Sequence, residues 1–280
     1  MSINIQSNAK INLGLKIEHK RKDEYHNIST LMQEINLYDE IIISHSNSKK
    51  IILDLKGIPT PNNDSNLCYI AAKHFLDTYK IKSGVHINLN KIIPIGAGLG
   101  GGSSNAASII KGLAKLFDIT ITNKSITSMV SNMGADIPFF IKGGLQLVEG
   151  MGDNLTPISP IPIKDLQFLL VIPPFYISTP WAYKVLNKTL QPDKSQPKFL
   201  PLSEPMKWEL FDNDFERVIH ETYPEIGQIK ASLINTGALY AGLSGSGSTV
   251  FGVFDNFQKA ETILGKFSQY QTFLTSPVFR

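Results

Sequence analysis

Hydrophobic and polar residues alternate over the first 55 positions in a way typical of β-strands. Apolar runs at residues 11–18, 31–37, 41–44 and 51–55 are rich in Ile and Leu and are separated by polar positions. A basic segment at 19–22 lies between the first two runs. The pattern predicts antiparallel strands, with the basic segment near a hairpin tip.

Helical spacing of apolar residues begins after a break at residues 58–64, which holds two prolines and an Asn-Asn pair. Ser65 can cap a helix that extends to about residue 79, and alternation at 85–89 then predicts a strand. After the next glycine-rich stretch, the pattern predicts helices at 106–117 and 125–133, a loop at 136–144 and a strand at 145–149.

A change in composition at residues 150–162, with two glycines and three prolines, marks the best candidate for a domain boundary. We expect an N-terminal domain at 1–152 and a C-terminal domain at 153–280. The second half predicts strands at 168–172, 238–243, 250–254 and 272–275, and helices from about 179 and at 214–221, 224–235 and 258–267. Strict β-α-β alternation is lacking, so the expected class is α+β.

Composition narrows the function classes. With 280 residues, 42% of them hydrophobic, the chain can bury a sizeable core without disulfides or metal. Lys plus Arg number 27 against 24 Asp plus Glu, and this small excess gives no reason to expect a nucleic-acid or membrane partner. The single cysteine, Cys68, and the lack of a signal-peptide pattern predict a cytoplasmic location.

Glycine is average in amount and uneven in position. Of 21 glycines, five lie at residues 96–102, five at 134–152 and four at 242–252. Because glycine allows sharp turns and close approach to a ligand, these three clusters are the first places to look for chemistry.

The pattern of the first glycine cluster predicts a phosphate-binding loop. A strand leads into residues with almost no side chains, and Ser103 and Ser104 then open an apolar helix, so backbone amides and a helix N-terminus are available to an anion. A flexible hinge or a capped turn is the alternative.

The spacing of the glycines also fits a dinucleotide-binding fingerprint literally, but Pro94 interrupts the preceding strand. A Walker A loop would need lysine where Gly102 stands.

Each of the other candidate positions allows two interpretations, one functional and one structural. Asp136, after Gly134, could accept a proton from a substrate hydroxyl or only cap a turn. Lys10 and Asn12 lie on one face of a strand, where a lysine is normally a solvated charge. The Ser-Gly alternation at 243–251 indicates either a hairpin turn or a close approach to a ligand. The six histidines show no metal-ligand spacing.

Taken in this order, the segments resemble the GHMP superfamily of small-molecule kinases, which includes galactokinase, homoserine kinase and mevalonate kinase. The loop at 96–104 resembles its phosphate motif, and 243–249 its C-terminal glycine motif. Residues 9–13, 23–26, 100–105 and 134–139 resemble the branch that phosphorylates diphosphocytidyl methylerythritol. The resemblance implies a ribosomal-protein-S5-domain-2-like N-terminal half, a ferredoxin-like C-terminal half, ATP and Mg²⁺ as cofactors, a small-molecule substrate, and a monomer or weak homodimer.

The resemblance also implies roles for single residues. Asp136 would be the general base, and Lys10 would keep it ionised. The ATP phosphates would contact Pro94, Ile95, Gly96, Ala97, Gly98, Leu99, Gly100, Gly101, Gly102, Ser103 and Ser104, and the adenosine would lie near Asn66 and Lys91. The substrate would contact Asn12, Tyr25, His26, Thr179, Tyr183, Gly245 and Ser246. Trp181 could replace Tyr183, and Glu24 stands where the branch usually has glycine before the Tyr-His pair.

Overall fold

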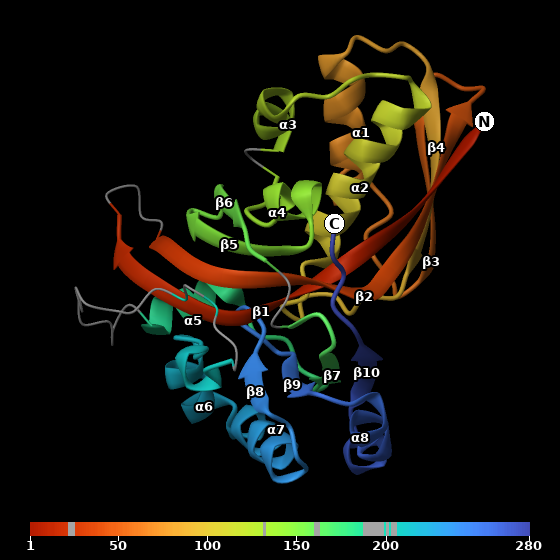
Figure 1. Cartoon of the computed structure of the whole chain (residues 1–280). Coiled ribbons are helices and arrows are strands. Elements are labelled where there is room, and N and C mark those ends of the chain that lie inside the picture. Colours follow the sequence, from red (N-terminus) through yellow and green to blue (C-terminus); the bar gives the residue numbers. More distant parts are fainter. Residues whose placement is uncertain (22–25, 131–132, 160–162, 187–198, 200–201, 203–205) are drawn as a thin grey trace. The chain divides into compact units, whose positions relative to one another are not determined.

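The structure is a computed structural model that describes residues 1–21, 26–130, 133–159, 163–186, 199, 202 and 206–280 (Figure 1). Its strands are β1 (Ser2–Lys20), β2 (His26–Ser46), β3 (Ile51–Gly57), β4 (Gly84–Lys91), β5 (Leu145–Gly150), β6 (Asn154–Pro157), β7 (Gln167–Ile172), β8 (Tyr240–Leu243), β9 (Val250–Phe254) and β10 (Gln271–Thr275). Its α-helices are α1 (Leu67–Thr78), α2 (Gly101–Leu116), α3 (Asn123–Val130), α4 (Ile137–Lys142), α5 (Thr179–Leu186), α6 (Glu216–Thr222), α7 (Pro224–Asn235) and α8 (Phe257–Thr262). Short 3₁₀ helices are η2 (Trp208–Leu210) and η3 (Leu264–Phe267).

The chain divides into two compact units, each built from several segments. The first unit comprises Met1–Ala9, Leu37–Ile95 and Gly100–Lys142, and the second comprises Lys10–Asn36, Gly96–Leu99 and Gly143–Arg280. Strands β1 and β2 pass from one unit into the other, and the glycine-rich segment after β4 does so twice. The expected boundary between residues 152 and 153 stays a prediction.

In the first unit, helices cover a small sheet. Strand β4 pairs antiparallel with the second half of β2, and β3 pairs parallel with β4. Helices α1 and α2 lie side by side (Figure 1). A Cβ added to Gly112 of α2 would lie 2.5 Å from side chains of both Ile5 and Ile43, so this helix packs tightly onto the strands. The prediction that β3 pairs antiparallel was wrong, because α1 connects β3 to β4 and a helical crossover returns the chain in parallel.

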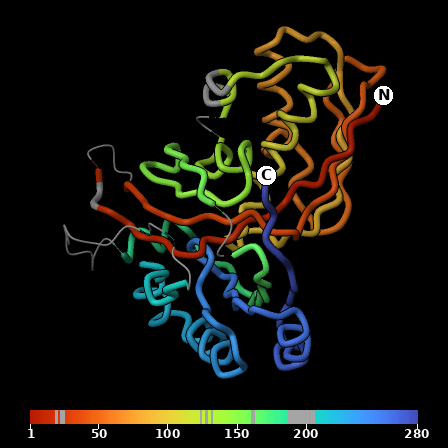
Figure 2. The backbone as a smooth tube through the Cα atoms, viewed as in Figure 1, coloured from red at the N-terminus to blue at the C-terminus, as the bar shows by residue number. Residues whose placement is uncertain are grey.

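The second unit contains an antiparallel sheet in the order β10-β7-β9-β8. Leu169 and Val171 of β7 and Phe254 of β9 are fully buried in its core, together with Ile219 of α6 and Leu233 of α7. Figure 2 follows the backbone of this C-terminal part in blue, through α7, β8, β9, α8 and β10. Mixed helices and antiparallel strands confirm the α+β prediction.

Two local predictions were incomplete. The runs at 31–37 and 41–44 form one continuous strand, β2, because Tyr38, Asp39 and Glu40 keep the extended backbone. The expected loop at 136–144 contains helix α4, whose Phe139 and Phe140 are buried. A six-residue helix is too short to be stable alone, so its packing, which no local pattern reports, decides its structure.

Candidate active site

The glycine-rich segment after β4 uses backbone conformations that glycine adopts most readily. Gly96, Gly98 and Gly100 have φ angles of 66°, 79° and 69°. A Cβ on Gly98 would lie 2.1 Å from the carbonyl oxygen of Ser244, in the loop between β8 and β9. Within the second unit, this part of the segment therefore lies directly against the third glycine cluster.

Helix α2 begins inside the glycine run. Its N-cap is Gly100, which provides no side-chain cap, and its first residue is Gly101. The first amides of a helix have no intrahelical acceptors and lie at the positive end of the helix dipole. Ser103 is half-buried and Ser104 is buried in the first turn. The predicted phosphate-binding residues 100–104 thus lie at a helix start, where backbone amides are available to an anion.

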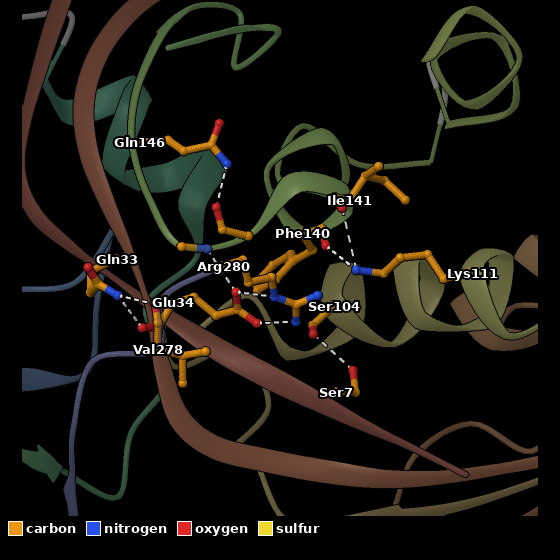
Figure 3. A network of polar contacts seen from close by, with 12 residues as sticks. Ser7, Gln33, Glu34, Ser104, Lys111, Phe140, Ile141, Gln146, Val278 and Arg280 are labelled. Atoms are coloured by element: carbon orange, nitrogen blue, oxygen red, sulfur yellow. Dashed lines mark hydrogen bonds and ion pairs between the residues drawn. The ribbon is translucent and has the colours of Figure 1, made fainter. Parts of the chain in front are cut away.

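A hydrogen-bonded network of buried polar side chains fixes the hydroxyl group of Ser104. Its Oγ lies 2.8 Å from Oγ of Ser7 (Figure 3). Asn105 donates from Nδ2 to Ser7 Oγ at 3.0 Å and to Asp39 Oδ2 at 2.8 Å. Asp39 is fully buried. Fixed hydrogen bonds of this kind limit the rotation of the Ser104 side chain.

Lys91, a predicted contact of the adenosine, is buried in the same network. Its ammonium group forms an ion pair with Asp39 and donates to Oδ1 of Asn105 at 3.2 Å. The other carboxylate oxygen of Asp39 accepts from the backbone amides of Ile92 and Ile93 at 2.7 and 2.8 Å. The pair therefore fixes the end of β4, from which the glycine-rich segment departs.

Asn66, the other predicted adenosine contact, is the N-cap of α1. Its Oδ1 accepts from the amide of Cys68 at 2.9 Å, and its Nδ2 donates to the carbonyl of Pro61 at 2.8 Å. The sequence predicted Ser65 as the cap of this helix, but the structure has Asn66 in that position. Burial raises the pKa of the Cys68 thiol to about 12, so this group stays protonated and is a poor nucleophile at neutral pH.

Asp136 immediately precedes helix α4 and is half-buried. The turn before the helix is closed by the amide of Ile137, which donates to the carbonyl of Gly134 at 3.3 Å. A Cβ on Gly134 would lie 3.2 Å from Oγ of Ser103. Within the first unit, the candidate base thus follows a turn that lies close to the first turn of α2.

Lys10 and Asn12 are brought together on β1 in the second unit. The buried Lys10 ammonium donates to Asn12 Oδ1 at 2.6 Å and to the carbonyl of Gly98 at 2.9 Å. Asn12 donates from Nδ2 to Thr30 Oγ1 at 2.8 Å, and its backbone amide donates to Ser244 Oγ at 3.2 Å. Lys10 is therefore not a solvated surface charge: its charge lies against the glycine-rich segment.

The third glycine cluster joins this group. Ser246 Oγ lies 2.7 Å from Oγ1 of Thr179, at the start of α5. A Cβ on Gly245 would lie 3.5 Å from Oδ1 of Asn12. Asn213 donates from Nδ2 to the carbonyl of Gly245 at 2.8 Å and so holds this loop in place. The structure thus gathers four of the predicted substrate contacts in one region of the second unit.

Of the two candidate aromatic residues, Tyr183 lies beside another predicted substrate contact. Its ring stacks on His26 with centroids 5.1 Å apart and an interplanar angle of 20°. Trp181 instead packs edge-on against Tyr223, with centroids 5.6 Å apart. Tyr25 lies outside the described residues.

Several residues of these groups were not singled out from the sequence. Asp39 offered a weak signal, since a carboxylate within an apolar strand pattern needs a buried partner. Ser244 lies within the Ser-Gly alternation, but the pattern did not distinguish it from its neighbours. Asn213 offered no signal, because its partners are distant in sequence. Over the described part of the chain, no three His, Cys, Asp or Glu side chains are grouped to hold a metal. Among the same residues, no helix is long and apolar enough to cross a bilayer.

Comparison with known proteins identifies the family. Residues 66–144 match the GHMP kinases N terminal domain, and residues 199–271 match the GHMP kinases C terminal domain. The 4-diphosphocytidyl-2-C-methyl-D-erythritol kinase of Chlorobium phaeobacteroides is 37% identical over 99% of this chain and 96% of its own. The enzyme of the same name from Syntrophus aciditrophicus is 40% identical over 94% of this chain and 95% of its own.

Solved structures agree. A crystal structure of 4-(cytidine 5'-diphospho)-2C-methyl-D-erythritol kinase is 27% identical, with a TM-score of 0.80 over 98% of this chain and 99% of that one. The mevalonate kinase of Methanococcus jannaschii shares the fold, with a TM-score of 0.75 at 18% identity over 99% of each chain. The resemblance seen in the sequence is confirmed: the chain belongs to the GHMP kinases and, within them, to the family of 4-diphosphocytidyl-2-C-methyl-D-erythritol kinases.

Proposed function

We propose that this chain transfers the γ-phosphoryl group of ATP to the 2-hydroxyl of 4-diphosphocytidyl-2-C-methyl-D-erythritol, in the non-mevalonate pathway of isoprenoid biosynthesis. The relatives that carry this substrate in their name align with nearly the whole chain. The single observation that carries the proposal is the buried ammonium of Lys10, which bonds both Asn12 and the carbonyl of Gly98. A cation beside a phosphate loop suits a reaction that moves negative charge.

ATP is proposed to place its phosphates along residues 94–104. The backbone amides of this segment and the start of α2 supply hydrogen-bond donors and a positive potential for the anion. Asn66 and Lys91 are proposed to lie near the adenosine. The positive-φ glycines support this assignment, since they leave the backbone uncovered.

Asp136 is proposed to accept the proton of the 2-hydroxyl. As the hydroxyl oxygen forms its bond to the γ-phosphorus, the bond between that phosphorus and the bridging oxygen breaks and ADP leaves. Lys10 would stabilise the negative charge that develops on the acceptor oxygen. Catalysis in such a reaction comes mainly from positioning and charge stabilisation, which these groups supply.

Mg²⁺ is proposed to enter with ATP. Mg²⁺ often keeps several waters and binds substrate phosphates together with one or two protein oxygens, so a cluster of carboxylates is not needed. Ser103, in the first turn of α2, is the hydroxyl we assign to it, because Ser104 already bonds Ser7. When bound, the ion would neutralise charge on the phosphates.

The cytidine end of the substrate is proposed to bind at His26 and Tyr183, together with Tyr25, where aromatic rings offer faces for stacking on the pyrimidine. Asn12, Thr179, Gly245 and Ser246 are proposed to contact the remainder of the substrate. Their support is the cluster that Asn12, Gly245 and the Thr179–Ser246 hydroxyl pair form in the second unit. The cytoplasmic location and the monomeric or weakly dimeric state remain predictions from the sequence.

The proposal predicts a strict substrate requirement. The purified protein with ATP and Mg²⁺ should release ADP, followed in a coupled assay, when diphosphocytidyl methylerythritol is present. Mevalonate and homoserine, which lack a pyrimidine for the aromatic side chains, should leave ADP release at its background rate. Equal release with either of these two alcohols would rule out the substrate assignment.

A further inference from the structure

Helices α2 and α4 run side by side in the first unit, and contacts at both ends set their register. Gly134, in the turn before α4, lies close to Ser103 at the start of α2, because a Cβ added to it would be 3.2 Å from Oγ of Ser103. About two turns further along α2, the ammonium of Lys111 donates to the carbonyl of Phe140 at 2.9 Å and to that of Ile141 at 3.4 Å (Figure 3). The helices therefore point in the same direction, with their starts at the same end.

The contact at Lys111 satisfies a physical need of α4. The last four carbonyls of any helix have no intrahelical donor, and both acceptors of Lys111 belong to this group. A cation at this end also opposes the negative pole of the helix dipole. Because α4 has only six residues, its orientation depends on packing and on such end contacts more than on its own hydrogen bonds.

The position of α4 matters because Asp136 is the residue directly before it. Phe139 and Phe140 are buried and keep the helix attached to the core. Apolar packing of this kind is not directional, whereas the hydrogen bonds from Lys111 fix how far α4 slides or tilts along α2. Any such movement at its C-terminal end displaces the carboxylate at its N-terminal end relative to Ser103.

We infer that Lys111 is a positioning residue of the phosphoryl-transfer reaction, which holds Asp136 in register with the phosphate-binding start of α2. The inference rests on the proposed function, in which Asp136 is the base. A mutation far from the reacting atoms that displaces a catalytic group by about 1 Å can lower the rate about 100-fold. The effect of replacing Lys111 is therefore expected on kcat. The affinity for ATP should change little, because the first turn of α2 stays intact.

The test compares Lys111→Met with Lys115→Met, an exposed lysine on the same helix, and with Lys111→Arg, which retains a donor. Lys111→Met should lower kcat about 10- to 100-fold, with an unchanged KM for ATP and a Tm lower by about 2–4 °C. Lys115→Met should match the unmodified protein, and Lys111→Arg should recover most of the lost kcat. A wild-type kcat in Lys111→Met, or equal losses of kcat and of ATP affinity, would overturn the inference.

A double-variant cycle separates this role from a general effect on structure. If Lys111 acts through the carboxylate of Asp136, then Lys111→Met should add little to the loss already caused by Asp136→Asn in single-turnover measurements. If the rate of the double variant falls by the product of the two single-variant losses, the inference about Lys111 is overturned and the proposed function still stands. Normal turnover by Asp136→Asn itself would overturn both.

Discussion

Replacing Asp136 with asparagine should lower kcat by about 10²- to 10⁴-fold, the usual contribution of a positioned general base. Asparagine has nearly the same shape as aspartate, so the turn before α4 and the burial of Phe139 and Phe140 should persist. The amide cannot accept the hydroxyl proton, and so the chemical step fails while the nucleotide still binds. Steady-state ADP release and calorimetric titration with ATP measure the two properties separately.

The matched control is Asp77→Asn, which removes an exposed carboxylate from α1 in the same unit. It changes the net charge by the same amount and should leave kcat and the affinity for ATP as they are. Full turnover by Asp136→Asn would contradict the assignment of the base. An equal loss in both variants would show that overall charge, and not the position of the carboxylate, determines the rate.

The second large effect is expected from Gly98→Ala. The φ of 79° at this position costs an L-residue about 1–2 kcal/mol. The new Cβ would also lie 2.1 Å from the backbone oxygen of Ser244, which cannot rotate away as a side chain could. The free energy of unfolding in urea should therefore fall by more than about 2 kcal/mol. Activity should fall with it, because the carbonyl of Gly98 accepts a hydrogen bond from Lys10.

Gly102→Ala is the control for this substitution. Gly102 lies in the first turn of α2, and the nearest atom to its added Cβ is a methyl carbon of Leu67 at 3.2 Å, which can shift. Alanine favours a helix over glycine by up to about 1 kcal/mol, so stability should stay equal or rise slightly. Equal destabilisation by both substitutions would contradict the close approach of Gly98 to the β8–β9 loop.

Local chemistry explains which parts of the site were visible in the sequence. The tight backbone of the glycine-rich segment was predictable, because positive φ angles and the lack of room for a Cβ at Gly98 favour glycine, and glycine shows directly in the residue types. Lys10 and Asn12 were placed on one face of a strand by the two-residue period, which the hydrogen bond between them bears out.

What the sequence could not provide depends on partners far along the chain. Asp39 is balanced by Lys91 and Asn105, and the loop at Gly245 is held by Asn213. Such pairs arise from tertiary packing and leave no local periodicity. Helix α4 was missed for the same reason, and the parallel pairing of β3 was hidden because alternation looks alike in parallel and antiparallel strands.

ATP is proposed to donate its γ-phosphoryl group to the tertiary 2-hydroxyl of the substrate. The ³¹P NMR spectrum of the product, recorded without proton decoupling, tests this most directly. The carbon at that position carries no hydrogen, so the new phosphomonoester should give a resonance without three-bond coupling to a proton. A doublet would place the phosphate on the secondary hydroxyl, and a triplet would place it on the primary hydroxyl. Either splitting would rule out phosphorylation of the 2-hydroxyl.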